Sequence, residues 1–323
     1  MTAFQLSINE AQERRLPRAS GIGDCARKQA YSMRNVGATN TGQRDGSLTT
    51  EQGRIMEDMS VELVRLASQD RLVVANRQIE LPEGFPMTGH PDGQVVPREL
   101  AHWDDRCAVC GDDPVDSVPC TPARNGHVYK AIGWVAPLDA TVDGLVTGFE
   151  HKHLGRWGFT EIFKQGFAES EPGYYAQTLA YGDALNWDRV MVVVLGQDSS
   201  SVQGDYNINL GAKNPKVRWS TKPGWHPKLQ IVNVDLGSTV NYQKRLRFRA
   251  EQLTKWLFED LVDPSEIVRE ADPTSLRKET PVLTESGEVE IRQGPDFPCS
   301  HCPWLTRCLS DGEGRLHAAA MAA

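Results

Sequence analysis

The chain has 323 residues and a formal net charge of −8 at pH 7, with 39% hydrophobic and 24% charged residues. This composition is typical of a soluble globular protein, and no run of about 18 apolar residues indicates a membrane span. The start of the sequence lacks the apolar stretch of a secretory signal, so we expect a cytoplasmic protein. Its seven cysteines are then reduced thiols or metal ligands rather than disulfides.

The first part of the sequence predicts a helix and then a pair of strands. Residues 51–69 have the apolar period of an amphipathic helix. Its apolar stripe consists of Ile55, Met56, Met59, Leu63, Leu66 and Ala67. Residues 72–81 and 86–96 are typical of two strands with a turn near residues 82–84. Residues 98–135 hold no period and are rich in Pro, Cys, Asp and Gly, which indicates an insertion.

The second part alternates strands and helices. Residues 138–143 and 145–152 predict a hairpin that turns at Asp143-Gly144. Helices are expected at residues 159–168, 172–186 and 238–262, and buried strands at residues 189–196 and 229–236. A polar loop then leads to three closely spaced cysteines. No internal repeat is present.

Two carboxylates and a lysine are expected to meet on neighbouring strands. Asp92 lies within the first strand pair, and Glu150 and Lys152 end the strand of the hairpin. Alternate residues of a strand point to the same face, so Glu150 and Lys152 share one face that Asp92 can reach. Carboxylate oxygens are the ligands that Mg²⁺ and Mn²⁺ prefer, and such a metal activates water and neutralises a phosphate. The lysine can orient that water or stabilise developing negative charge.

Glu57 is a candidate third metal ligand. On the predicted helix it shares a face with Val61 and Val64, whereas Asp58 and Arg65 lie on the solvated side. A carboxylate among valines is unfavourable unless something binds it. Each of these residues alone has an ordinary explanation, such as a turn or a solvated edge. The combined order on helix, strand and strand favours a site.

Four cysteines near the two ends have the character of a metal site. Cys299, Cys302 and Cys308 form a C-x2-C-x5-C triplet, and Cys25 stands alone near the start. Three thiolates cannot complete a four-thiolate site, so Cys25 is a candidate fourth ligand. Four thiolates suit an iron–sulfur cluster or a structural zinc, and either would tie the two ends of the chain together.

These motifs together resemble the PD-(D/E)XK nucleases of the RecB-like class. Pro91-Asp92 and Glu150-x-Lys152 match the motif that names the family, and Gln177 and Tyr181 match its Q-x-x-x-Y motif on a helix. Ser20-x4-Cys25-x-Arg27 with the cysteine triplet resembles the iron–sulfur subgroup, which includes CRISPR-associated RecB-like exonucleases and the AddB-type nuclease domain. The CRISPR-associated members carry a His where Glu57 stands. A Glu there is more similar to viral recombination exonucleases, which would act in the host cytoplasm.

The resemblance covers about residues 20–308 without the insertion and implies a fold, a site and cofactors. The fold is α/β, with a mixed central sheet flanked by helices and an iron–sulfur cap that joins both ends. It implies a four-iron cluster on Cys25 and the triplet, with zinc as the alternative. Asp92, Glu150, Glu57 and the His151 carbonyl are the implied Mg²⁺ or Mn²⁺ ligands. Lys152 positions the water, and Gln177 and Tyr181 orient the phosphate or the lysine. The implied segments are residues 1–50, a nuclease core at 51–262, and a cluster segment at 263–323.

The insertion at residues 98–135 is a candidate zinc site. Its ligands would be Cys107, Cys110, Cys120 and His127, with His102 as a competing fourth ligand. A polar segment of this length has little material for a core of its own, so a metal would help it to fold. The alternative is three reduced thiols in a loop.

A basic segment is the candidate DNA-binding region. Residues 206–234 contain no Asp or Glu, and their candidate DNA-binding residues are Lys213, Lys216, Arg218, Trp219 and Lys222. Lysine and arginine neutralise phosphates, and Trp219 or Trp225 could stack on bases. The alternative is a solvated loop whose tryptophans belong to the core. No base-reading motif is present, so we expect weak sequence preference.

The sequence therefore predicts a metal-dependent DNA exonuclease acting on single strands or DNA ends. By family analogy its role is in recombination or genome processing, with a recombination protein as a partner. The sequence leaves two alternatives open. One is a catalytically silent DNA-binding or assembly module. The other is a structure-specific or nicking endonuclease.

Overall fold

The computed structural model describes residues 16–37, 46–104, 133–196, 229–268, 278–283, 289–294, 302–312 and 314–316. These residues form two compact units. The sheet unit consists of the described residues of Asp45–Glu83 and Gly89–Val240. The terminal unit consists of those of Met1–Arg44, Gly84–Thr88 and Asn241–Ala323. The expected core at 51–262 included the helix that begins at Val240, whereas the contacts group most of this helix with the two ends of the chain.

The sheet unit contains a mixed sheet, as expected for an α/β fold. In the described part of the chain it has eight strands in the order β3-β4-β1-β2-β6-β7-β8, and β5 pairs with β6. The pairs β1/β4 and β6/β7 are parallel and the others antiparallel. The strands are β1 (Leu72–Ala75), β2 (Gly93–Pro97), β3 (His102–Asp104), β4 (Gly133–Val135), β5 (Thr141–Val142), β6 (Leu145–Leu154), β7 (Arg189–Gly196) and β8 (Leu229–Asp235).

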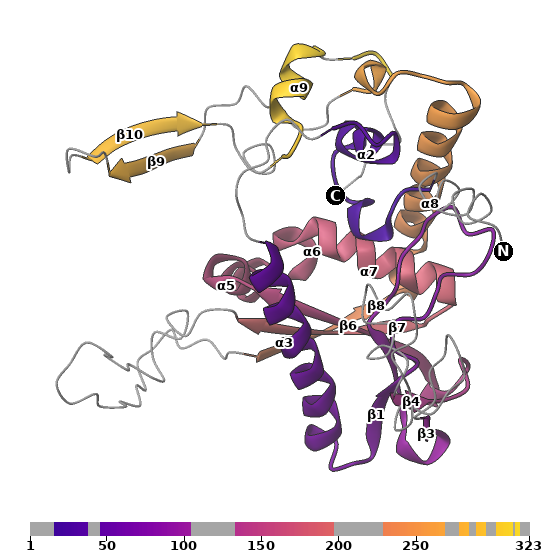
Figure 1. The fold of residues 1–323 in the computed structure, drawn as a ribbon. Coiled ribbons are helices and arrows are strands. Elements are labelled where there is room, and N and C mark those ends of the chain that lie inside the picture. The colour runs from indigo at the N-terminus through magenta and orange to yellow at the C-terminus, as the bar shows by residue number, and fades with distance from the viewer. Residues whose placement is uncertain are drawn as a thin grey trace, which may run out of the picture. The chain divides into compact units, whose positions relative to one another are not determined.

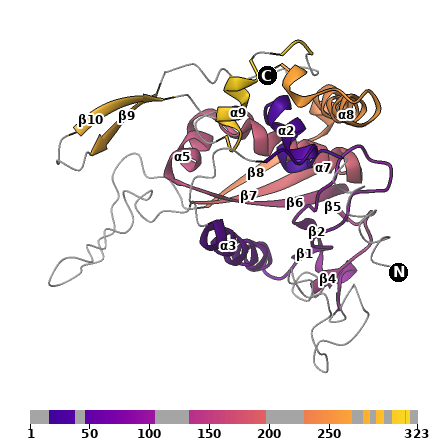
Figure 2. The ribbon, with the colours of Figure 1, turned by 45° about the horizontal axis from the view of Figure 1, so that its top comes forward.

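Helices cover both faces of this sheet (Figures 1 and 2). Helix α3 (Gly46–Ala67) lies on one face, and α5 (Arg156–Gln165), α6 (Phe167–Ser170) and α7 (Pro172–Leu185) lie on the other. The core beneath α3 brings Val64 together with Val95, Phe149 and Val193 of three neighbouring strands. Burying these apolar side chains stabilises the unit by roughly 1.5–3 kcal/mol for each side chain. Helix α3 carries Glu57 on one face, and α7 carries Gln177 and Tyr181 on the other.

The face of α3 that packs on the sheet is not the predicted one. Ile55, Met59 and Leu66 of the expected apolar stripe are 50–56% exposed. The buried positions are instead Ser60 and Val64, and Val61 packs against the same core. The helix is oriented by this mixed polar and apolar set, because Ser60 hydrogen-bonds to a histidine of β6. The prediction of a helix is confirmed, and that of its packing face is wrong.

The paired strands β6 and β7 form the buried centre of the sheet. They run parallel in a register that pairs Glu150 with Val192 and Lys152 with Val194. The predicted buried strand at residues 189–196 is confirmed as β7. The next strand, β8, is at the end of the strand order, and Val234 is its one buried residue. The prediction of a strand at residues 229–236 is confirmed, and the prediction that this strand is buried is wrong.

Both ends of the expected insertion belong to the sheet. The predicted hairpin is present, with Asp143 and Gly144 between β5 and β6. Residues 98–104 and 133–135 do not form part of an irregular insertion, because β3 and β4 pair with each other and β4 pairs with β1. Residues 105–132, with the predicted zinc ligands Cys107, Cys110, Cys120 and His127, lie outside the described residues.

The terminal unit packs the N-terminal helix α2 (Ala26–Met33) against α8 (Val240–Thr254). Their shared core contains Ala26, Ala30, Leu253, Leu257 and Ile267. The predicted long helix ends as a π-helical turn at Lys255–Glu259, followed by a 3-10 turn, η7 (Pro264–Glu266). Within the expected polar loop, β9 (Lys278–Leu283) and β10 (Val289–Gly294) form an antiparallel pair. The last helix is α9 (Leu305–Ser310).

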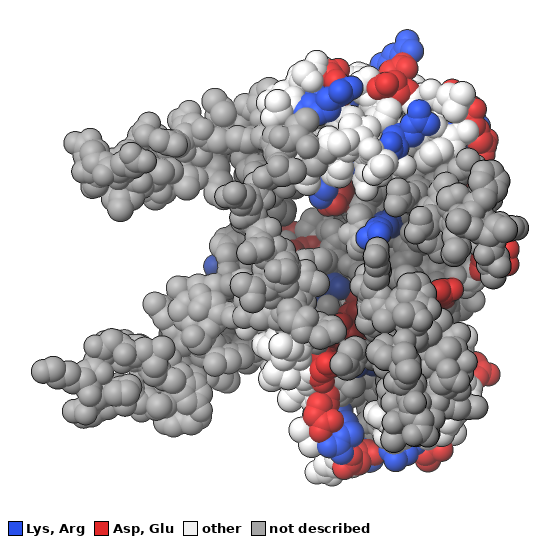
Figure 3. Space-filling view, viewed as in Figure 1, with Lys and Arg blue, Asp and Glu red and all other residues white. Residues whose placement is uncertain are grey.

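Surface charge is mixed on the face shown in Figure 3. Among the described residues, Lys and Arg lie beside Asp and Glu without a broad field of one sign. The predicted DNA-binding residues Lys213, Lys216, Arg218, Trp219 and Lys222 lie outside the described residues. Among the described helices, none is long and apolar enough to cross a membrane.

Candidate active site

The register of β2 and β6 brings Asp92 beside Glu150. Gly93 of β2 pairs with Phe149 of β6, so the residues that follow on this antiparallel ladder are Asp92 and Glu150. The backbone ladder between β2 and β6 ends at the pair of Gly93 and Phe149, and the next bond between the two segments is made by the Asp92 side chain. Its Oδ2 accepts a hydrogen bond from the backbone N–H of His151 at 2.7 Å. The two predicted carboxylates therefore meet at one point of the sheet.

Glu150 and Lys152 form a buried ion pair at this point. The Lys152 Nζ lies 2.7 Å from the Glu150 Oε2, and the Glu150 side chain is fully buried. The Glu150 Oε1 has no hydrogen bond of normal geometry to any described residue. The backbone N–H of Asp92 is nevertheless close enough to lower the pKa of Glu150. A buried carboxylate oxygen without a strong donor favours a cation as its partner.

Glu57 joins this group from helix α3, but an arginine also holds it. The Glu57 Oε1 lies 2.7 Å from the Arg77 Nη2, and the Arg77 Nη1 lies 2.8 Å from Asp58. Asp58 was expected to be solvated and is exposed, yet it is paired. Arg77 follows β1 by two residues and was not predicted as a site residue. A lone Arg in a turn carries no local pattern, so only the fold identifies it.

Burial and mutual repulsion raise the pKa values of all three carboxyls. Burial and then Glu150 raise the pKa of Asp92 to about 7. Burial raises the pKa of Glu150, against the effect of Lys152. Burial and then Asp92 raise the pKa of Glu57, although Arg77 opposes the shift. Such crowding disfavours three ionised groups unless a positive charge joins them.

Lys152 stays charged in this setting. Burial alone would lower the pKa of Lys152, but Glu150 and Asp92 outweigh burial and raise it. Its Nζ lies 5.2 Å from the centre of the Tyr174 ring on α7, within range of a cation–π contact. Tyr174 was not predicted as a site residue. The lysine is thus a fixed positive charge that can act on a neighbouring anion or water.

The predicted Gln177 and Tyr181 lie together on α7. The Gln177 Nε2 donates to the Tyr181 Oη at 3.2 Å. Burial and then the charge of Glu150 raise the pKa of Tyr181. The Tyr181 ring also packs on the backbone at Gly89, where an added Cβ would come within 2.8 Å of a ring carbon. This close approach holds the residues before Asp92 against the helix.

The His151 side chain points away from the carboxylates, toward α3. Its Nδ1 lies 2.7 Å from the Ser60 Oγ, which donates to the Met56 carbonyl at 3.0 Å. The hydroxyl therefore accepts from Nδ1–H, and burial lowers the pKa of His151 to about 3. The imidazole is neutral and serves the packing of α3. Metal binding by the His151 carbonyl stays a prediction.

The donor set of this site fits a hard divalent cation. Within the described ranges, no three His, Cys, Asp or Glu side chains are already arranged around a common point as metal ligands. The carboxylates of Glu57, Asp92 and Glu150 are nevertheless close enough to raise one another's pKa values. The site offers oxygen ligands and excess negative charge, and the buried Glu150 Oε1 has no hydrogen bond of normal geometry among the described residues. These properties suit Mg²⁺ or Mn²⁺.

Three of the four terminal cysteines lie in the terminal unit. Cys25 precedes α2, Cys302 precedes α9, and Cys308 is on α9. None of the three forms a disulfide, and all are partly buried. Burial chiefly raises the pKa of Cys302, and the nearby Cys25 and Cys308 raise it further. Three neighbouring reduced thiols fit a zinc or iron–sulfur centre. Cys299 lies outside the described residues.

Comparisons with known proteins give one structural match. No protein-family model matches this sequence, and no curated protein matches it significantly. A solved structure of a phage-related exonuclease from Haemophilus somnus 129PT aligns with 76% of this chain and 96% of its own chain. The identity is 10% and the TM-score 0.39. A likeness at this TM-score carries no argument about function, which is inferred from the site and the sequence.

The raised pKa of Asp92 predicts a pH-dependent cost to the metal-free protein. A carboxyl with a raised pKa binds its proton more tightly when folded. Its contribution to stability is therefore present below about pH 4 and lost as the pH rises through about 7. We expect the free energy of unfolding of the native protein, relative to Asp92→Asn, to fall across this range in EDTA. Urea unfolding at several pH values measures the difference.

The lowered pKa of His151 makes the free energy of unfolding rise with pH, opposite to the effect of Asp92. His151 is present in both proteins, so its contribution cancels when the two are compared. Asp139→Asn, at an exposed Asp of the same unit, is the matched control and should follow the native profile. Parallel profiles for the native protein and Asp92→Asn would contradict the crowding of the carboxyls.

Arg77 should stabilise the site by holding Glu57. We expect Arg77→Gln to lower the free energy of unfolding by about 2 kcal/mol in EDTA at pH 7, because a partly buried carboxylate loses its charged donor. A double-mutant cycle with Glu57→Gln isolates the coupling of this pair. Arg65→Gln, at a partly exposed arginine that pairs with Glu62 on the surface of α3, should cost much less. Zero coupling between Arg77 and Glu57 would contradict the account.

Proposed function

We propose that this protein is a metal-dependent deoxyribonuclease that hydrolyses phosphodiester bonds. The observation that carries the proposal is the Glu150 carboxylate. It is fully buried, paired with Lys152 at 2.7 Å, adjacent to Asp92, and has an oxygen without a normal hydrogen bond to the described residues. Such a set gives a cation its ligands and a reacting phosphate a nearby positive charge.

Each residue has a distinct role in this proposal. Asp92, Glu150 and Glu57 would hold Mg²⁺ or Mn²⁺, with the His151 carbonyl as a further ligand. When bound, the metal lowers the pKa of water and neutralises phosphate charge. Lys152, held by Glu150, orients the attacking water and stabilises negative charge on the phosphate oxygens. Tyr181, oriented by Gln177, is placed to contact the phosphate or to fix the position of the lysine.

The finer features of the proposal come from the sequence. They are exonucleolytic action on single strands or DNA ends, a recombination or genome-processing role with a protein partner, and DNA contacts by the basic segment at residues 206–234. A four-iron cluster on Cys25, Cys299, Cys302 and Cys308 is part of the proposal, with zinc as its alternative. So is zinc at Cys107, Cys110, Cys120 and His127.

Lys152→Ala should abolish cleavage while leaving DNA binding. We expect the native protein with Mn²⁺ to degrade linear single-stranded DNA and to spare circular DNA. Loss of the lysine should reduce the rate by a factor on the order of 10²–10³ or more. Gel assays of both substrates and filter binding measure these effects. Lys164→Ala, at an exposed lysine of α5, is the matched control and should keep full activity.

The outcomes of this assay separate the alternatives. Cleavage of circular as well as linear DNA would indicate an endonuclease. Binding without cleavage by the native protein, at any divalent metal tested, would support a silent DNA-binding module and overturn the proposed activity. A Lys152→Ala protein that cleaves at the native rate would refute the role of this site.

A further inference from the structure

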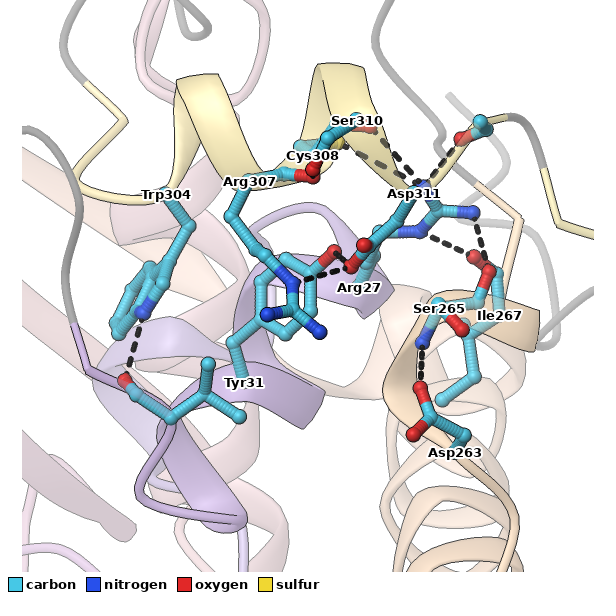
Figure 4. Close-up of polar contacts among 12 residues, drawn as sticks. Arg27, Tyr31, Asp263, Ser265, Ile267, Trp304, Arg307, Cys308, Ser310 and Asp311 are labelled. Atoms are coloured by element: carbon cyan, nitrogen blue, oxygen red, sulfur yellow. Dashed lines mark hydrogen bonds and ion pairs between the residues drawn. The ribbon is translucent and has the colours of Figure 1, made fainter.

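Arg27 is a fully buried arginine at the centre of the terminal unit. It lies on α2, and its guanidinium reaches two other segments (Figure 4). Its Nε donates to the Ile267 carbonyl at 2.6 Å and its Nη2 to the Ser265 carbonyl at 2.8 Å. Its Nη1 donates to the Gly312 carbonyl and lies 3.5 Å from the Cys308 carbonyl and 3.8 Å from the Cys308 sulfur.

This buried charge has no carboxylate partner among the described residues. Its oxygen acceptors are all backbone carbonyls, which satisfy hydrogen bonds but carry no net charge. The Asp311 carboxylate instead accepts from the Tyr31 hydroxyl at 2.7 Å and from Arg307 at 2.9 Å (Figure 4). A buried cation without a counter-charge is strongly unfavourable. The Cys308 sulfur is the remaining contact atom, and it can carry negative charge.

We infer that Arg27 is the buried counter-cation and positioning residue of an anionic metal–thiolate centre that includes Cys25, Cys302 and Cys308. The inference rests on the proposed thiolate centre and is independent of the nuclease chemistry of the sheet unit. Three thiolates already outweigh the positive charge of Zn²⁺ or of a four-iron core, so either centre is an anion. A guanidinium at the Cys308 sulfur compensates this charge and donates to the ligand, which stabilises the loaded form.

Arg27 also holds the ligand-bearing segments at a fixed distance. Cys25 lies two residues before Arg27 on the same segment. Cys308 lies on α9, and the Arg27 guanidinium contacts both its carbonyl oxygen and its sulfur. Packing around the guanidinium is tight, since a Cβ at Gly314 would lie 2.5 Å from the Arg27 Nη2. The Trp304 Nε1 adds a bond to the Val36 carbonyl at 2.8 Å. The two ends of the chain are thus joined by side chains as well as by the proposed metal.

The test compares metal retention in the full-length protein and three variants. Arg27→Met removes charge and donors, and Arg27→Lys keeps the charge but not the fork of donors. Arg34→Met is the control, because Arg34 lies in the same unit and its Nη1 donates to the Leu257 carbonyl at 2.9 Å, in a segment that carries none of these cysteines. Proteins are purified without oxygen, iron and zinc are counted for each chain, and the rate of metal transfer to a chromogenic chelator is followed.

We expect Arg27→Met to weaken metal binding about 10–100-fold, as is typical for partners of metal ligands. Arg27→Lys should show an intermediate loss, and Arg34→Met should bind metal like the native protein even if its unfolding temperature falls. If the metal is iron, loss of the positive charge should make the reduction potential more negative in Arg27→Met than in Arg27→Lys.

Two results would overturn this inference. One is a native protein that contains neither iron nor zinc after anaerobic purification. This result would not affect the proposed nuclease activity, which the DNA cleavage assay tests separately. The other is equal metal transfer, and for iron an equal potential, in the native protein and Arg27→Met. If Arg27→Met does not fold, Arg27→Lys decides, and native-like transfer in that variant would count against the donor role.

Discussion

The buried ion pair between Glu150 and Lys152 is the interaction on which the candidate site depends. Removing both charges from water costs several kcal/mol for each ion in real proteins, so the pair persists only where its surroundings compensate. Asp92 supplies a second negative charge for Lys152, and the Tyr174 ring lies within cation–π range. These contacts stabilise the lysine better than the carboxylates, whose pKa values all rise. The site is therefore short of positive charge, and a divalent cation would supply it.

The two faces of β6 divide catalysis from packing. Glu150 and Lys152 face α7, whereas Phe149 and His151 face α3. His151 stays neutral and bonds to Ser60, so it holds α3 in place without adding charge. Glu57 reaches the carboxylates from that helix. The alternation of β6 thus places Glu150 and Lys152 on one face and the packing against α3 on the other, and Glu57 is a proposed ligand contributed from the α3 side.

The sequence was sufficient to predict the groups that converge, but not how the helices are oriented around them. Asp92, Glu150 and Lys152 follow from strand alternation and a motif, and Gln177 and Tyr181 from helical spacing. The packing face of α3 could not be predicted from its apolar stripe. The face that packs on the sheet contains the polar Ser60, and its bond to His151 is visible only in the fold. Arg77 and Tyr174 have no local signature, since their roles arise from pairing across the fold. β9 and β10 lie in a stretch whose polar composition resembles a loop.

Soaking a crystal of the protein in Mn²⁺ would show whether the two carboxylates share a cation. We expect an anomalous scattering peak at direct coordination distance from oxygens of both Asp92 and Glu150, with the Lys152 ammonium still beside Glu150. A crystal in which Mn²⁺ at saturating concentration binds elsewhere, or in which the two carboxylates remain bonded only to protein, would contradict this expectation.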